Sequence, residues 1–282
     1  MDFHRYVGAE HLNFSCCDTA FSVHVEGVRA RAAARRARET TFELESQLNA
    51  FDEGSAVAAL NRTGRVENAH VARLVERGLE YAERTGGRFD VRQGETEHRV
   101  KRYLRGDADD FSAAFSDGHV TVEGDRVEAD VVLDLNGLAK GYVVDRGAEA
   151  LSGLGRRGFV DGGGDMSPPT GRIAVESPYG DETPLKVLET DWAVASSGSY
   201  RRYRGGTDHI YDPERGRVGA QSELVTVVAA RDCMEADALA TTLAASHPEE
   251  AIELAEGWPD LETFLVTDGV FRETEGFHDH VA

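Results

Sequence analysis

The sequence lacks any run of about twenty apolar residues, so no segment has the length and composition of a transmembrane helix. The opening stretch "MDFHRYVGAEHLNF" is polar and does not contain the apolar segment of a secretory signal peptide. The Arg35–Arg36 pair lies in an Ala/Arg-rich stretch with no apolar run after it, unlike an export signal. We therefore expect a cytoplasmic protein with no membrane span.

Positive charge is also in short supply. There are 31 basic residues against 51 acidic ones, which gives a formal net charge of −20. Because an acidic surface repels phosphate backbones, this balance excludes nucleic acid as a partner. Lysine is almost absent: Lys101, Lys140 and Lys186 stand against 28 arginines. The acidic excess predicts a halophilic protein whose self-repulsion is screened by salt; an ordinary acidic protein is the alternative.

Cysteine is the third scarce residue, with Cys16, Cys17 and Cys233 only. The first two are adjacent, which is poor geometry for a bridge between them. No CxxC pair exists, so the spacing does not favour a zinc site. Free buried thiols in a reducing compartment are the expectation.

The apolar patterns alternate between helix and strand periods along the chain. Helices are expected at 28–50, 56–61, 69–84, 138–151 and 232–246, and strands at 19–27, within 119–135, at 158–162, from 192 and over 223–231. A hairpin closes the sequence, whereas residues 92–117 show no clear period and are expected to form a surface excursion. Hairpins mixed with crossover helices predict an α+β fold, with one domain over 1–282, a mixed sheet and packed helices.

Two side chains of the segment "DCMEADALATTLAA" could hold a metal ion. Asp237 and Thr241 are four residues apart and therefore lie on one face of the expected helix. A carboxylate and a hydroxyl are hard oxygen ligands that suit Mg²⁺. By themselves two oxygens do not define a metal site, and the pair alone favours a plain hydrogen bond on an exposed helix face.

Four other segments carry polar groups with more than one interpretation. Glycines 162–164 in "FVDGGGDM" form either a ligand-binding turn or a simple strand turn. His209 in "GTDHIYDPERGRV" is either a general base or a surface histidine. The stretch "SSGSYRRY" offers hydroxyls and the arginines at 201–202 for a phosphate. In "DLNGLAKGYVVDR", Lys140 begins a helix, where it either binds an anion or is solvated.

Taken in order, these segments resemble the ApbE family of FAD:protein FMN transferases, over about residues 15–245. The resemblance rests on "TAFSVHV", "GSAVAALNR", "TGGRFDV", "DLNGLAKGYVVDR", "FVDGGGDM", "AVASSGSYRRY", "HIYDPERG" and "VTVVAARDCMEADALATTLAA". It implies a Mg²⁺-dependent enzyme that cleaves FAD, attaches FMN to a Thr or Ser hydroxyl of a target flavoprotein and releases AMP. An FAD pyrophosphatase that gives FMN and AMP, and a non-catalytic flavin-binding module, are the alternatives.

The resemblance also assigns roles to residues. It implies His209 as the base that takes the proton of the acceptor hydroxyl, and Asp237, Thr241 and the carbonyl of Gly137 as metal ligands. The positions implied to bind FAD are Cys17, Ser55, Arg88, Phe89, Asp90, Asp134, Lys140, Asp165 and Ile210.

This sequence departs from the family pattern in two places. After "RFD" it reads "VRQGETEHRV", where the family has a Thr-Val-Gly-Pro-Leu-like stretch, so one wall of the flavin site is altered. Asp208 stands where many members have a first histidine, which leaves His209 alone.

Overall fold

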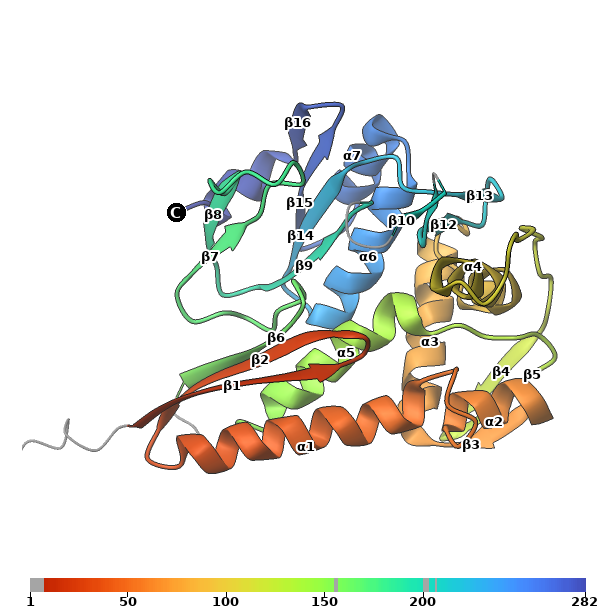
Figure 1. Ribbon diagram of the computed structural model, residues 1–282, viewed down its shortest axis with the longest axis horizontal. Helices are drawn as coiled ribbons and strands as arrows, with labels where there is room; N and C mark the ends of the chain where they lie inside the picture. Colours follow the sequence, from red (N-terminus) through yellow and green to blue (C-terminus); the bar gives the residue numbers. More distant parts are fainter. Residues whose placement is uncertain (1–7, 155–156, 200–202, 206) are drawn as a thin grey trace, which may run out of the picture.

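The computed structural model describes residues 8–154, 157–199, 203–205 and 207–282. Two antiparallel half-sheets organise it (Figure 1). The first has the order β1-β2-β6, with β1 Gly8–Cys16, β2 Thr19–Gly27 and β6 Arg157–Gly162. The second has the order β16-β15-β14-β9, with β9 Ala193–Ser197, β14 Leu224–Ala229, β15 Leu261–Thr267 and β16 Val270–Glu273.

Met166 joins the two half-sheets. Met166 forms isolated bridges with Asp161, in β6, and with Val194, in β9. The predicted α+β fold is confirmed. All strand pairs within the described part of the chain are antiparallel. The predicted mixed sheet, with both parallel and antiparallel pairs, is therefore not seen there, and the helices pack on antiparallel sheets.

Three helices pack on one another and on the half-sheets: α1 Ala30–Leu48, α5 Asn136–Glu149 and α6 Cys233–Ala245. The β1–β2 hairpin lies along α1 (Figure 1). Helix α6 is buried along almost its whole length, because small and apolar residues such as Ala236, Leu239 and Ala240 let it pack between α5 and the second half-sheet. Its two acidic side chains, Glu235 and Asp237, are therefore buried as well.

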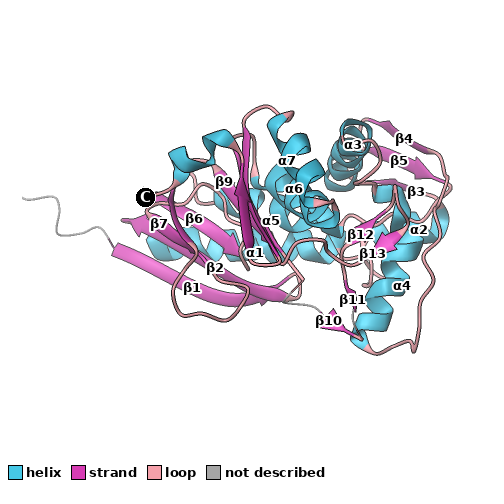
Figure 2. Ribbon diagram, turned by 90° about the horizontal axis from the view of Figure 1, so that it is seen from above, coloured by secondary structure: helices cyan, strands magenta, loops and turns pink. Residues whose placement is uncertain are grey.

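A second group of elements lies to one side of this body (Figure 2). It comprises α2 Ala56–Thr63, α3 Ala69–Arg84, α4 Gly94–Arg105 and the small sheet of β3 Arg65–Glu67, β4 Val120–Glu123 and β5 Arg126–Ala129. The other described elements are β7 Arg172–Val175, β8 Lys186–Glu189, β10 Tyr203–Arg204, β11 Thr207–Asp208, β12 Tyr211–Asp212, β13 Arg217–Val218, α7 Pro248–Glu256 and the 3₁₀ turns Val91–Gln93 and Glu275–His280.

Helix α3 spans the predicted residues 69–84, because its apolar residues recur at helical spacing and Asn68 accepts hydrogen bonds from its first amides. Helix α4 was not predicted: residues 94–105 of the expected surface excursion form a regular helix. Within the described residues, no helix is both long enough and apolar enough to cross a bilayer.

Candidate active site

A pocket of about 680 Å³ opens between the two groups of elements. Its walls come from the β1–β2 turn, the C-terminal end of α1, helix α4, the start of α5, the end of β9, residue 209 and α6. Six of the predicted site residues line it: Cys17, Gly137, Lys140, His209, Asp237 and Thr241. The structure thus brings together side chains that are up to 224 positions apart (17 to 241) in the sequence.

The glycines on either side of Lys140 allow its helix to approach its neighbours. A Cβ on Gly141 would lie 2.3 Å from the carbonyl oxygen of Cys233, so only glycine lets α5 and α6 come this close. The amide of Gly141 uses this proximity to donate a hydrogen bond to Asp237 Oδ2, at 2.9 Å. A Cβ on Gly137 would lie 2.9 Å from the ring of Phe89. The close packing fixes Lys140 at the pocket wall.

The Lys140 centre consists of Lys140, Asp165 and Asp237. The ammonium group forms ion pairs with Asp165 and, at 3.4 Å, with Asp237 Oδ1. Asp165 and Asp237 are almost fully buried, whereas Lys140 remains partly accessible from the pocket. Because buried carboxylates need a charged partner, Lys140 stabilises both of them. The three residues come from α5, the turn after β6, and α6.

Thr241 lies one helical turn after Asp237 and faces the same pocket. Its hydroxyl lies 3.5 Å from the hydroxyl of Ser197, at the end of β9. Asp237, Thr241 and the Gly137 carbonyl would present only hard oxygen donors, with room beside them in the pocket. This donor set fits Mg²⁺, which takes one or two carboxylates and leaves its other positions to water or phosphate.

His209 lines the pocket from the loop between β11 and β12. The loop is held by Asp208, whose carboxylate accepts amide hydrogen bonds from Ile210 at 2.8 Å and Ala220 at 2.9 Å. Burial raises the pKa of Asp208 above its ordinary value. Ile210 is buried in the hydrophobic core, and its predicted contact with FAD stays a prediction. The arginines at 201–202 lie outside the described residues.

The Lys101 centre, formed by Lys101, Glu97 and Asp134, lies on another wall of the same pocket and was not predicted. Lys101 Nζ lies 2.7 Å from Asp134 Oδ2 and 3.3 Å from Glu97 Oε2. Asp134 also faces His98 Nε2, at 3.2 Å. Asp134, predicted to bind FAD, does not itself line the pocket and contacts it through Lys101.

In the Lys101 centre, burial and the neighbouring charges shift the pKa values in opposite directions. Burial on its own lowers the pKa of Lys101, but the two carboxylates hold that pKa above its ordinary value. Burial on its own raises the pKa of Asp134, but Lys101 and His98 hold it well below its ordinary value. Burial raises the pKa of Glu97. Lys101 and Asp134 therefore form a charged pair at neutral pH.

The remaining predicted residues do not line the pocket. Ser55 caps α2 by accepting the amide hydrogen bond of Ala58. Arg88 pairs with Glu214 at 3.0 Å, and Asp90 binds Arg92 at 2.8 Å. Phe89 packs behind Gly137. Their contact with FAD stays a prediction.

The β1–β2 turn carries Cys17 into the pocket. Cys16 pairs with Thr19, so Cys17 and Asp18 form a two-residue turn, and their φ angles of 53° and 55° are both left-handed. The Cys17 amide donates to Glu45 Oε1, at 2.6 Å, from α1. The hydrogen bond to Cys17 and burial raise the pKa of Cys16.

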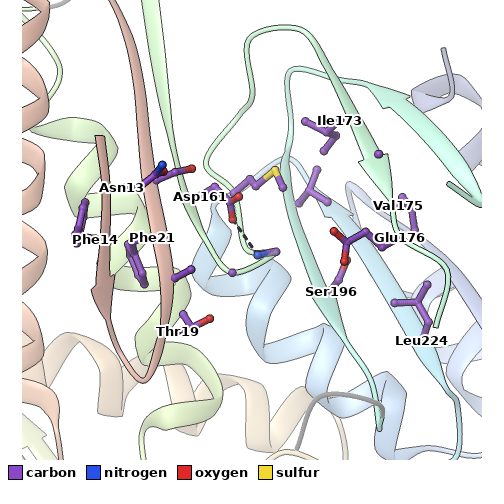
Figure 3. A pocket seen from close by; sticks show the side chains of 17 residues that line it. Asn13, Phe14, Thr19, Phe21, Asp161, Ile173, Val175, Glu176, Ser196 and Leu224 are labelled. Atoms are coloured by element: carbon purple, nitrogen blue, oxygen red, sulfur yellow. Dashed lines mark hydrogen bonds between the residues drawn. The ribbon is translucent and has the colours of Figure 1, made fainter. Parts of the chain in front are cut away.

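A second hollow of about 450 Å³ adjoins the pocket and shares Thr19, Gly163 and Ser196 with it. Figure 3 shows it between the β1–β2 hairpin on one side and β7 and β9 on the other. Its wall along β7 is apolar at Ile173 and Val175. Its charged lining residues are both acidic, Asp161 and Glu176.

The sequence profile of the ApbE family matches residues 17–265, which is most of the chain. This chain belongs to the ApbE family. The match includes every pocket-lining residue from Cys17 to Thr241.

Two curated relatives are named FAD:protein FMN transferase. The Vibrio cholerae protein is 34% identical over 173 residues, which are 55% of this chain and 52% of that protein. The chain thus matches about half the length of this relative. The Treponema pallidum protein is 29% identical over 315 residues, covering 93% of this chain and 86% of that protein.

Solved ApbE structures have the same fold. The Thermotoga maritima ApbE protein superposes with a TM-score of 0.81 at 23% identity, over 98% of this chain and 100% of that one. The apo flavinyl transferase ApbE of Pseudomonas stutzeri gives 0.80 at 23% identity, over 100% of both chains. At this identity the likeness establishes the fold alone.

Proposed function

We propose that this ApbE-family protein is a Mg²⁺-dependent FAD:protein FMN transferase. The observation that carries the proposal is the convergence of Lys140, Asp237 and Thr241 with His209 in one pocket. Cleavage of a pyrophosphate requires positive charge at the phosphoryl oxygens and a nucleophile activated by a base, and in this set Lys140 offers the charge and His209 the base. The names of the two curated relatives support the same activity.

In the proposed reaction, a Thr or Ser hydroxyl of the target flavoprotein attacks the FMN phosphorus of FAD. A new P–O bond forms to the acceptor, and the bond to the AMP oxygen breaks. His209 takes the acceptor proton, and AMP leaves with the bonding electrons. Lys140 stabilises negative charge that develops on the phosphoryl oxygens.

Asp237, Thr241 and the carbonyl of Gly137 would hold Mg²⁺, which when bound supplies charge neutralisation at the pyrophosphate. Lys140 and Gly141 orient Asp237 for that role, since the Gly141 amide binds one carboxylate oxygen and Lys140 pairs with the other. The Asp237 side chain therefore has a fixed orientation before any ligand arrives.

The second hollow favours transfer to a protein over simple hydrolysis. Water needs no binding surface, whereas an acceptor segment needs room beside the FAD pocket. The hollow adjoins the pocket at Thr19, Gly163 and Ser196. Its lining carboxylates, Asp161 and Glu176, favour an acceptor segment that is neutral or basic near its hydroxyl.

The acidic composition leads us to propose a salt-rich cytoplasm as the working environment, where cytoplasmic flavoproteins are the targets. The net charge of −20 is tolerated when salt screens self-repulsion.

One assay separates the three candidate functions. The protein is incubated with FAD and Mg²⁺, with and without a Thr-containing acceptor domain, and AMP and the acceptor mass are followed. A flavinylated acceptor supports the transferase. AMP with an unmodified acceptor indicates a pyrophosphatase, and bound flavin without AMP indicates a binding module.

A further inference from the structure

Cys16, Cys17 and Glu45 form a cluster of ligand atoms that takes no part in the proposed transfer step, although Cys17 is predicted to contact FAD. One ligand atom from each residue lies within 4.8 Å of the others. In the part of the chain that the structure describes, no other three His, Cys, Asp or Glu side chains come together in this way. The cluster lies at the edge of the pocket, since Cys17 and Glu45 both line it.

Adjacent side chains of a strand point to opposite faces, so neighbouring cysteines do not normally converge. Here the strand ends at Cys16, and the left-handed conformation of Cys17 turns the second thiol back toward the first. A two-residue turn with two left-handed positions favours Gly, Asn and Asp, which tolerate this conformation. Asp18 fits this rule, whereas Cys17 does not. Residues that break a local rule beside a pocket often have a function.

The separation of the two sulfurs matches a shared metal ion. With Zn–S bonds of about 2.3 Å and tetrahedral angles, two thiolates on one ion lie about 3.8 Å apart. The Sγ atoms of Cys16 and Cys17 are 3.8 Å apart. Glu45 adds a carboxylate on the same side, and the Cys17 amide holds one of its oxygens at 2.6 Å. Such an outer hydrogen bond orients a ligating carboxylate.

We propose that Cys16, Cys17 and Glu45 bind a thiophilic divalent cation such as Zn²⁺, with the fourth coordination position open to the pocket. Binding exchanges the thiol protons for the cation, and the protons pass to solvent. Thiolates select a softer ion than the all-oxygen set at Asp237 and Thr241, so the two sites discriminate between Zn²⁺ and Mg²⁺. The missing CxxC spacing does not prevent the site, because the turn brings the thiols together.

The test uses Cd²⁺ as a probe, because its bonds to thiolates give a charge-transfer absorption band in the ultraviolet. The full chain is kept reduced and titrated with Cd²⁺ in the absence of FAD. We expect a band that saturates at one equivalent, is removed by Zn²⁺ and is unaffected by excess Mg²⁺. Absence of the band, or its removal by Mg²⁺, would overturn the proposal.

Variants identify the residues that give rise to the absorption band. Cys17→Ser should abolish it, and Glu45→Gln should weaken Cd²⁺ binding by roughly tenfold or more. The matched control is Cys233→Ser, which removes a buried thiol at the start of α6 and should leave the band unchanged. Cys17 is substituted rather than Cys16 because Cys17 is only partly buried. Thermal unfolding checks that each variant folds. A band that survives Cys17→Ser, or one lost in Cys233→Ser, contradicts the site.

Discussion

The Lys140 and Lys101 centres place two of the three lysines of the chain in one pocket, each between two carboxylates. They differ in how they are built. The Lys140 centre joins three distant segments, whereas the Lys101 centre uses a one-turn pair on α4 and one residue from the loop before α5. The first lies in segments that follow the family pattern, whereas Glu97 of the second lies in "VRQGETEHRV", which departs from it. We therefore expect the first centre to take part in the chemistry and the second to support the pocket wall.

The largest effect should come from the Lys140 centre. Asp237→Ala removes the carboxylate that Lys140 and Gly141 orient, and a metal contributes several kcal/mol at such a site, so turnover should fall by about 10³-fold or more. AMP release is measured over a range of Mg²⁺ concentrations. Asp237→Asn keeps the shape and should be nearly as inactive, whereas Thr241→Ser keeps a hydroxyl and should retain more activity. Unchanged turnover in Asp237→Ala would refute the metal assignment.

His209→Ala should separate binding from chemistry. Loss of a general base reduces the rate by about 10²- to 10⁴-fold, so acceptor flavinylation should fall by this factor. FAD affinity, followed by flavin fluorescence, should stay close to that of the wild type because Lys140 and the pocket walls remain. A variant that loses FAD affinity and keeps the transfer rate would assign His209 to binding instead.

The Lys101 centre should affect stability more than chemistry. Lys101→Met leaves Asp134 buried without its main partner, which should lower the free energy of unfolding by about 3 kcal/mol. The double variant Lys101→Met/Asp134→Asn removes both charges and should recover much of this loss. Urea denaturation measures both. If Lys101→Met lowers the rate of AMP release as strongly as Lys140→Met does, the two centres do not differ in the way we infer.

The smallest effect is a pH dependence of stability. Asp134 has a folded pKa below its ordinary value, so it adds stability above the ordinary value of about 3.9, and this is lost as the pH falls toward the folded pKa. Glu97 has a raised folded pKa, so its contribution to stability increases as the pH falls. A Glu97→Gln background removes this opposing contribution. In that background, Asp134→Asn should flatten the decrease in stability below about pH 4. An equally steep decrease would show that Asp134 is not the source.

The sequence predicts best those features that follow from helix geometry alone. The apolar spacing of α3 and the four-residue spacing of Asp237 and Thr241 both follow from helix geometry, and both are seen. Asp134 was recognised, but its partner was not, because Lys101 lies 33 positions earlier and only folding brings them together.

Helix α4 was missed for a physical reason. Few of its residues are apolar, and its pocket side carries Glu97 and Lys101, so it lacks the apolar stripe by which helices are recognised. The convergence of the thiols was missed because Cys17 is not a typical residue of a left-handed turn. In both cases the missed feature lies at the pocket.

The scarcity of lysine makes the pocket chemically addressable. Primary amines are the targets of acylating reagents, and apart from the N-terminus this chain has three. Lys101 and Lys140 line the pocket, whereas Lys186 is on β8 and pairs with Glu273 at 2.8 Å, away from it. Protection of two lysines by a bound nucleotide, with Lys186 as an internal reference, can therefore be read from a single peptide-mass spectrum of the unaltered protein.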